Sequence, residues 1–133
     1  MCIRDRFRNS DFNIKNTVDA ISHATCGMAI DIDAAAIAAC TLSGMTARMV
    51  SRFRPPVDIL GLTTDEKTWR KLAMSWGVCP ALCEEFNSTD VLFYTAAKVA
   101  KEKMGLKRGD RIVITGGATG HSGNTNLIKI EEI

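Results

Sequence analysis

Three hydroxyl side chains and one glycine stand close together at residues 41–46. An apolar run precedes this segment, and an amphipathic pattern typical of a helix follows it. A strand that turns sharply into a helix leaves the first helical amides unpaired and partly positive, which favours an anion. We therefore predict a phosphate site here, with Ser43 as the helix N-cap and an empty cap as the alternative. The predicted site residues are Thr41, Leu42, Ser43, Gly44, Met45 and Thr46.

A second segment rich in glycine and hydroxyl residues lies near the end of the chain, at residues 116–123. Its glycine spacing matches neither a dinucleotide-binding fingerprint nor a phosphate loop that ends in Lys-Ser/Thr. His121 could act as a general base, but no carboxylate near it in the sequence is an evident orienter. We predict instead that His121 hydrogen-bonds within its loop or assists an anion, and that the segment adds contacts to the anion through Gly120, His121, Ser122 and Gly123.

Length and composition exclude several classes of partner. The 133 residues suit one domain, and 46% hydrophobic with 24% charged residues is typical of a soluble globule. A net charge of +2 is too small to indicate nucleic acid or an anionic membrane as a partner. No apolar run approaches the ~20 residues that a membrane span needs.

Five cysteines, an odd number, lie mostly in apolar segments. This usage favours reduced thiols in a cytoplasmic protein over a disulfide framework. Cys79 and Cys83 have no second pair and no histidine at metal-ligand spacing, so we expect no metal site. Residues 1–15 lack periodicity and the apolar segment of a signal peptide. We expect a non-native or disordered leader there, and one domain at residues 16–133.

Capping residues and periodicity predict four helices. Asn16 caps the first helix, which ends near Asp31, and the second runs from Ser43 to the prolines after Arg54. Ser88 opens the fourth helix.

The third predicted helix has a capping box formed by Thr63 and Glu66, and Gly77 closes it. Four apolar residues recur at helical spacing within it, which predicts a buried stripe. They are Trp69, Leu72, Ala73 and Trp76.

Five strands are expected between and after the helices, at residues 34–40, 57–63, 78–83, 111–115 and 125–130. Pro80 places the third strand at a sheet edge, because proline cannot donate to a ladder. About ten residues without a helical pattern join the last two strands, so the last strand should be antiparallel. Right-handed crossovers then favour a three-layer α/β/α fold with a mixed sheet of order 3-2-1-4-5.

This strand order predicts where a ligand binds. The chain changes direction between strands 1 and 4, and ligands of open α/β sheets bind at such a switch point, outside the carboxyl ends of the strands. Residues 41–46 and 116–123 leave those two strand ends, so the two polar segments should lie side by side. Their adjacency favours a ligand site over an empty helix cap.

Several motifs in residues 16–133 resemble the C-terminal domain of pyruvate kinase. They are DAISHATC at 19–26, TLSGMTARMVSRFRP at 41–55, LAMSWGV at 72–78, KRGD at 107–110 and SGNTN at 122–126. The resemblance implies the same sheet order, with strand 5 reversed. It also implies a tetramer in which this domain contacts neighbouring subunits and the catalytic barrel.

In allosteric members the domain binds a phosphorylated small-molecule effector. The resemblance implies one phosphate on residues 41–46, with the loop at 116–123 closing over the effector. Members that bind fructose 1,6-bisphosphate typically hold the second phosphate with a tryptophan and an arginine from the region matching 84–97. This chain has neither residue there, which leaves a single-phosphate effector, such as a nucleotide or sugar monophosphate.

The catalytic site of pyruvate kinase lies in a (β/α)₈ barrel and its lid, which do not fit into these 133 residues. The resemblance therefore implies a domain without catalytic residues or cofactors of its own. The full enzyme is expected to use Mg²⁺ and K⁺ to convert phosphoenolpyruvate and ADP to pyruvate and ATP in glycolysis. The alternatives are a structural version of the domain with an unused phosphate site, and a free-standing protein that binds a phosphorylated ligand.

Overall fold

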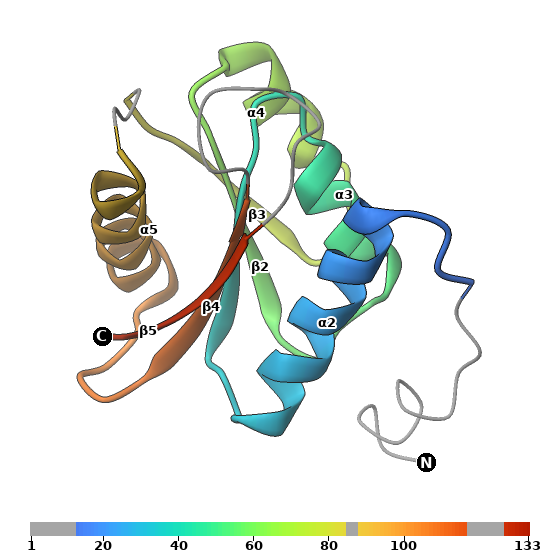
Figure 1. Cartoon of the computed structure of the whole chain (residues 1–133). Coiled ribbons are helices and arrows are strands. Elements are labelled where there is room, and N and C mark those ends of the chain that lie inside the picture. Colours follow the sequence, from blue (N-terminus) through green and yellow to red (C-terminus); the bar gives the residue numbers. More distant parts are fainter. Residues whose placement is uncertain (1–12, 85–87, 117–126) are drawn as a thin grey trace.

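A five-stranded sheet lies between two layers of helices in the computed structural model, which describes residues 13–84, 88–116 and 127–133 (Figure 1). The strand order is β3-β2-β1-β4-β5. The pairs β1–β2, β1–β4 and β2–β3 are parallel, and β5 is antiparallel to β4. The predicted fold class and strand order are thus confirmed. The strands are β1 (Ala36–Cys40), β2 (Asp58–Thr63), β3 (Val78–Leu82), β4 (Arg111–Gly116) and β5 (Leu127–Glu132).

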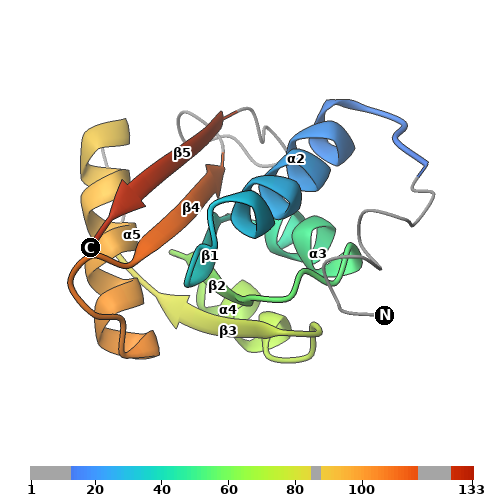
Figure 2. The ribbon, with the colours of Figure 1, turned by 90° about the horizontal axis from the view of Figure 1, so that it is seen from below.

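Four helices in the described residues cover the two faces unequally. Three of them, α2, α3 and α4, contribute to the core on one face, and α5 alone contributes to the core on the other (Figures 1 and 2). Their bounds are α2 (Thr17–Asp31), α3 (Met45–Arg52), α4 (Glu66–Leu72) and α5 (Thr89–Met104). No described helix is long and apolar enough to cross a bilayer.

The central strand β1 is buried along its whole length. Ile37 and Ala39 pack with α2 and α3, whereas Ala36 and Ala38 pack with α5. Small side chains let helices approach the strand closely from both faces. For this reason the alanine-rich run forms a strand, although alanine has the highest helix propensity.

The prediction for α4 is wrong at both ends. Its N-cap is Asp65, whose carboxylate accepts a hydrogen bond from the Thr68 amide at 2.9 Å. Thr63 is instead the last residue of β2, and its carbonyl accepts a hydrogen bond from the Cys83 amide at 2.9 Å. The helix ends at Leu72, so Gly77 lies beyond it, next to β3.

The predicted apolar stripe of α4 is confirmed only at Leu72, which is buried, whereas Ala73 and the two tryptophans are exposed. Trp69 is 38% exposed, because this two-turn helix turns Thr68 and Leu72 toward the protein interior, and Trp76, which is 47% exposed, lies beyond the helix end. Leu72 fits there because β2 has a glycine below it: a Cβ on Gly61 would lie 2.9 Å from Leu72 Cδ1. Two tryptophans are therefore left on the surface.

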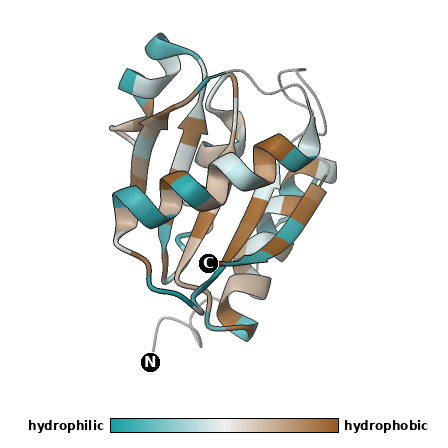
Figure 3. Ribbon diagram, turned by 90° about the vertical axis from the view of Figure 1, so that its left-hand side faces the viewer, coloured by the Kyte–Doolittle hydropathy of each residue, from teal (hydrophilic) through white to brown (hydrophobic). Residues whose placement is uncertain are grey.

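The predictions for α2 and α5 agree with the structure at their caps. Asn16 Oδ1 accepts a hydrogen bond from the Asp19 amide at 2.9 Å, and Ser88 Oγ accepts one from the Val91 amide at 3.3 Å. Hydrophilic stretches mark α5 in the foreground of Figure 3, and hydrophobic stretches of strand lie behind it. Its buried face is made by Leu92, Ala96 and Ala100.

Candidate anion-binding site

Both polar segments identified in the sequence begin at the carboxyl ends of neighbouring parallel strands. The first follows Cys40 at the end of β1, and the second follows Gly116 at the end of β4. A Cβ on Gly116 would lie only 3.0 Å from the Cys40 carbonyl oxygen, so these two strand ends are in tight contact. The predicted site residues Gly120, His121, Ser122 and Gly123 lie outside the described residues, and their role stays a prediction.

The predicted helix cap is shifted by one residue. Ser43 is not the N-cap of α3; the N-cap is Gly44, at φ +90°, and it has no side chain to cap the helix. Glycine is favoured there because this left-handed backbone is strained for other residues. Thr41 Oγ1 accepts a hydrogen bond from the Gly44 amide at 2.9 Å, and Ser43 Oγ accepts a longer one from the Met45 amide at 3.4 Å.

The predicted residues of the first segment differ in exposure. Ser43 is exposed, and Leu42 and Met45 are each 38% exposed. Gly44 is buried against α4, and Thr46 is 5% exposed. The segment thus presents the Ser43 hydroxyl and its backbone to solvent, whereas the Thr46 hydroxyl is largely covered.

Thr68 of α4 contacts this segment, and sequence reasoning missed it. Its Oγ1 lies 2.8 Å from the Leu42 carbonyl oxygen and 2.8 Å from Asp65 Oδ2. Its side-chain methyl lies 3.4 Å from the position of a Cβ on Gly44. The residues in contact are separated by 26 positions, so no local sequence signal connects them.

The charges around the start of α3 differ from those at the other described helices. The first turn of α3 has no acidic residue, whereas the first turns of α2, α4 and α5 contain Asp19, Glu66 and Asp90. Arg48, one turn into α3, has no ion pair within the described part of the chain, and its Nε lies 4.0 Å from the position of a Cβ on Gly44. Among the described residues, the first turn of α3 thus has no carboxylate of its own, and the carboxylate of Asp65, the N-cap of α4, lies beyond Thr68.

A basic residue further along α3 is already paired. Arg52 forms an ion pair with the buried Asp19 of α2 at 3.2 Å, and its guanidinium lies 4.7 Å from the centre of the Phe53 ring. Arg52 thus joins α3 to α2, which leaves Arg48 as the α3 cation closer to the helix start.

The thiol of Cys40, next to the segment, is unreactive at neutral pH. Burial raises the pKa of Cys40 to about 12, and the neighbouring Cys83 adds to the effect. Cys40 is therefore a neutral thiol at pH 7, neither a nucleophile nor a charge in the site. No group of three possible metal-ligating side chains occurs among the residues that the structure describes.

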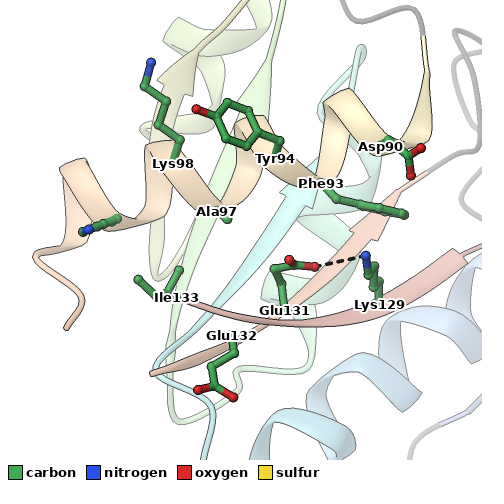
Figure 4. Close-up of a pocket in the computed structure, with 10 residues that line it drawn as sticks. Asp90, Phe93, Tyr94, Ala97, Lys98, Lys129, Glu131, Glu132 and Ile133 are labelled. Atoms are coloured by element: carbon green, nitrogen blue, oxygen red, sulfur yellow. Dashed lines mark ion pairs between the residues drawn. The ribbon is translucent and has the colours of Figure 1, made fainter. Parts of the chain in front are cut away.

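A groove of about 470 Å³ between α5 and β5 lies on the face opposite α3 (Figure 4). Lys129 points toward Phe93 there, with its Nζ 4.4 Å from the ring centre and 3.1 Å from Glu131 Oε2. The charged lining residues balance in number: Lys98, Lys101 and Lys129 against Asp90, Glu131 and Glu132. Such a groove has no net charge with which to attract an anion.

Comparison with known proteins connects this fold to an enzyme family. Residues 19–131 match the family model described as "Pyruvate kinase, alpha/beta domain". The pyruvate kinase of Clostridium acetobutylicum is 44% identical over 120 residues, which are 90% of this chain and 25% of that protein. That of Lactobacillus delbrueckii subsp. bulgaricus is 40% identical over 127 residues, 95% of this chain and 22% of that protein. The chain thus spans about a quarter of the length of the curated relatives it matches, and it belongs to the pyruvate kinase α/β domain family.

Proposed function

We propose that this chain is the regulatory and assembly domain of a pyruvate kinase and binds a phosphorylated small-molecule effector at the start of α3. The full enzyme transfers a phosphoryl group from phosphoenolpyruvate to ADP in glycolysis. This domain supplies no catalytic group to that reaction. Its contribution is to bind the effector and to contact the catalytic barrel and neighbouring subunits.

The observation that carries the phosphate proposal is the unfilled start of α3. Its N-cap residue has no side chain, its first turn has no acidic residue, and the Arg48 guanidinium lies nearby. A helix start of this kind favours a negative charge, through its amides and its dipole. The exposed Ser43 hydroxyl adds a donor at the same place.

The proposed effector carries a single phosphate, as in a nucleotide or sugar monophosphate. Residues 84–97 contain neither tryptophan nor arginine that could hold a second one. Phosphate desolvation and loop ordering offset most of the hydrogen-bond energy, so we expect a Kd for inorganic phosphate on the order of 1 mM. Contacts from residues 120–123 would tighten the binding of a whole effector.

Thermal unfolding in phosphate tests the proposal, with sodium chloride at equal ionic strength as the reference. At roughly ten times the Kd, phosphate should stabilise the native chain by about 1.4 kcal/mol. Ser43→Asp should remove this gain, because its carboxylate occupies the anion position. Thr17→Asp, which adds the same charge at the exposed start of α2, should keep it. Equal gains in the wild type and Ser43→Asp would leave α3 with an ordinary helix cap.

Absence of catalysis is a separate part of the proposal. Phosphoryl transfer requires metal carboxylates and cationic groups that clamp the transferred phosphate. A purified sample of this chain should form no ATP from phosphoenolpyruvate and ADP. Turnover that co-purifies with the chain and survives removal of host enzyme would contradict the proposal.

A second function, subunit assembly, is supported by β5. This strand pairs only with β4 among the described strands, and Ile130 is 42% exposed on it. If β5 paired with its copy around a two-fold axis at Ile130, Lys129 would face the copy's Glu131 on both sides of the axis. Opposite charges facing each other stabilise an antiparallel pair, and pairing removes an open edge.

Sedimentation of charge-swapped variants tests this assembly. Lys129→Glu should weaken self-association about tenfold, because the new carboxylate would face the carboxylate of the copy's Glu131 on both sides of the axis. Adding Glu131→Lys to that variant should restore association. An equally weak double variant, or a wild-type chain that stays monomeric at high concentration, would rule out this interface.

A further inference from the structure

The Leu42–Ser43 peptide has a fixed direction in the structure. The Leu42 carbonyl oxygen lies 2.8 Å from Thr68 Oγ1, so it points toward α4. Thr68 is only 6% exposed, and its hydroxyl is therefore shielded from competing water. The described chain has no cis peptide bond, and in a trans peptide the N–H points opposite to the C=O. The Ser43 N–H consequently points away from α4.

This N–H is available to a ligand. Ser43 is exposed, and its N–H donates to no acceptor within the described ranges of the chain. The next two amides differ, since Gly44 and Met45 donate to Thr41 Oγ1 and Ser43 Oγ. The reversed peptide would present the Leu42 carbonyl at the site instead, and a carbonyl oxygen repels an anion.

We propose that Thr68 is a positioning residue of the anion site, whose hydroxyl holds the Leu42–Ser43 peptide so that the Ser43 N–H faces the ligand. This inference rests on the proposed function, because it assigns the orientation of one donor to a residue of another helix. Thr68 does not touch the anion; it acts through the Leu42 carbonyl.

The second acceptor near Thr68 does not prevent this role. The hydroxyl has one proton, and both the Leu42 carbonyl and Asp65 Oδ2 lie 2.8 Å away. Asp65 Oδ2 also accepts the Thr68 backbone N–H at 2.9 Å, so the carboxylate keeps a donor when the hydroxyl bonds to Leu42. The Thr68 hydroxyl is thus shared between the loop and the helix cap, and only the cap has a second donor from Thr68.

Two variants separate the hydroxyl from the rest of the side chain. Thr68→Val keeps the shape and removes the donor, and Thr68→Ser keeps the donor. Titration with inorganic phosphate, followed by amide NMR, should give Thr68→Val a Kd about fivefold higher than that of the wild type, the effect of one hydrogen bond. Thr68→Ser should bind within twofold of the wild type. Without phosphate, the ¹³C chemical shift of the Leu42 carbonyl should differ from that of the wild type in Thr68→Val and should be unchanged in Thr68→Ser.

The outcomes distinguish this inference from the proposed function. If Thr68→Val binds phosphate as the wild type does, or if its Leu42 signal does not move, the positioning role is overturned and the anion site stands. If the wild-type chain shows no phosphate-specific response, the anion site itself is overturned. Melting temperatures measured in chloride identify variants with a general loss of stability. Such a loss would weaken the NMR signals of all helices together.

Discussion

The starts of α3 and α4 lie side by side and are built in opposite ways. At α4, the Asp65 carboxylate accepts hydrogen bonds from the Thr68 amide and hydroxyl, so the helix start contains its own anion. At α3, the N-cap is Gly44, and the first turn has no acidic residue. Under the proposed function, the carboxylate cap of α4 serves stability, and the start of α3, whose Gly44 and Met45 amides donate only to neutral hydroxyls, leaves room for an external anion.

Gly44→Ala is expected to have the largest effect on stability. A side chain at φ +90° is strained, although its Cβ would make ordinary van der Waals contacts of 3.4 Å with Leu72 and Thr68. We expect a loss of about 1–3 kcal/mol in the free energy of unfolding, measured by denaturant titration. Gly105→Ala is the matched control at φ +63° in open space, with an expected loss of about 1 kcal/mol. Equal losses would mean that a side chain at φ +90° is no more strained than one at φ +63°.

Removing the capping side chains should affect the melting temperature differently at the two helix starts. Asp65→Ala should lower the melting temperature by about 3 °C, because α4 loses the side chain that satisfies its amides. Ser43→Ala should change it by less than about 1 °C, since the bond from Met45 is long, at 3.4 Å, and exposed. A large loss in Ser43→Ala would show that the start of α3 is capped for stability as well.

The pH dependence of the α4 cap gives a smaller effect. Hydrogen bonds from the Thr68 hydroxyl and amide hold the pKa of Asp65 below its ordinary value of 3.8. Since the folded pKa is lowered, the stabilisation is complete above the ordinary pKa and is lost as the pH falls through the folded pKa.

Melting at a series of pH values checks this effect. The wild type should exceed Asp65→Ala in melting temperature at pH 6, and the difference should shrink toward pH 2. Thr68→Val should raise the Asp65 pKa measured by NMR, because it removes the largest cause of the shift. An unchanged pKa in Thr68→Val would mean that the backbone hydrogen bond alone stabilises the carboxylate.

Much of the fold followed from a few residues in the sequence. Pro80 indicated an edge strand and the short connection before β5 indicated a reversed strand, and both are confirmed. A proline lacks a backbone donor, and a short connection is too short for a parallel crossover. Both constraints act locally and depend little on distant packing. The buried face of α4 was predicted correctly only at Leu72, which fits the space above Gly61; hydrophobicity also favoured Trp69 and Trp76, which are exposed.

The candidate site was less predictable than the fold. The sequence identified residues 41–46 by their hydroxyls and glycine, and the structure places this segment at the carboxyl edge of β1. Capping geometry depends on a single backbone angle at Gly44, which the sequence does not specify between neighbouring positions. The contact from Thr68 depends on how α4 packs, so it could be recognised only in three dimensions.

The most direct test of the central claim is an amide NMR titration of the native chain with inorganic phosphate, against sodium chloride at equal ionic strength. Saturable chemical-shift changes are expected for the amides of residues 43–46 at millimolar phosphate, with the Ser43 signal among those that change most. The amide signals of residues 66–68 at the start of α4 should not shift. Equal shifts at both helix starts, or no shift beyond that caused by chloride, would contradict the claim that α3 is left open for an anion.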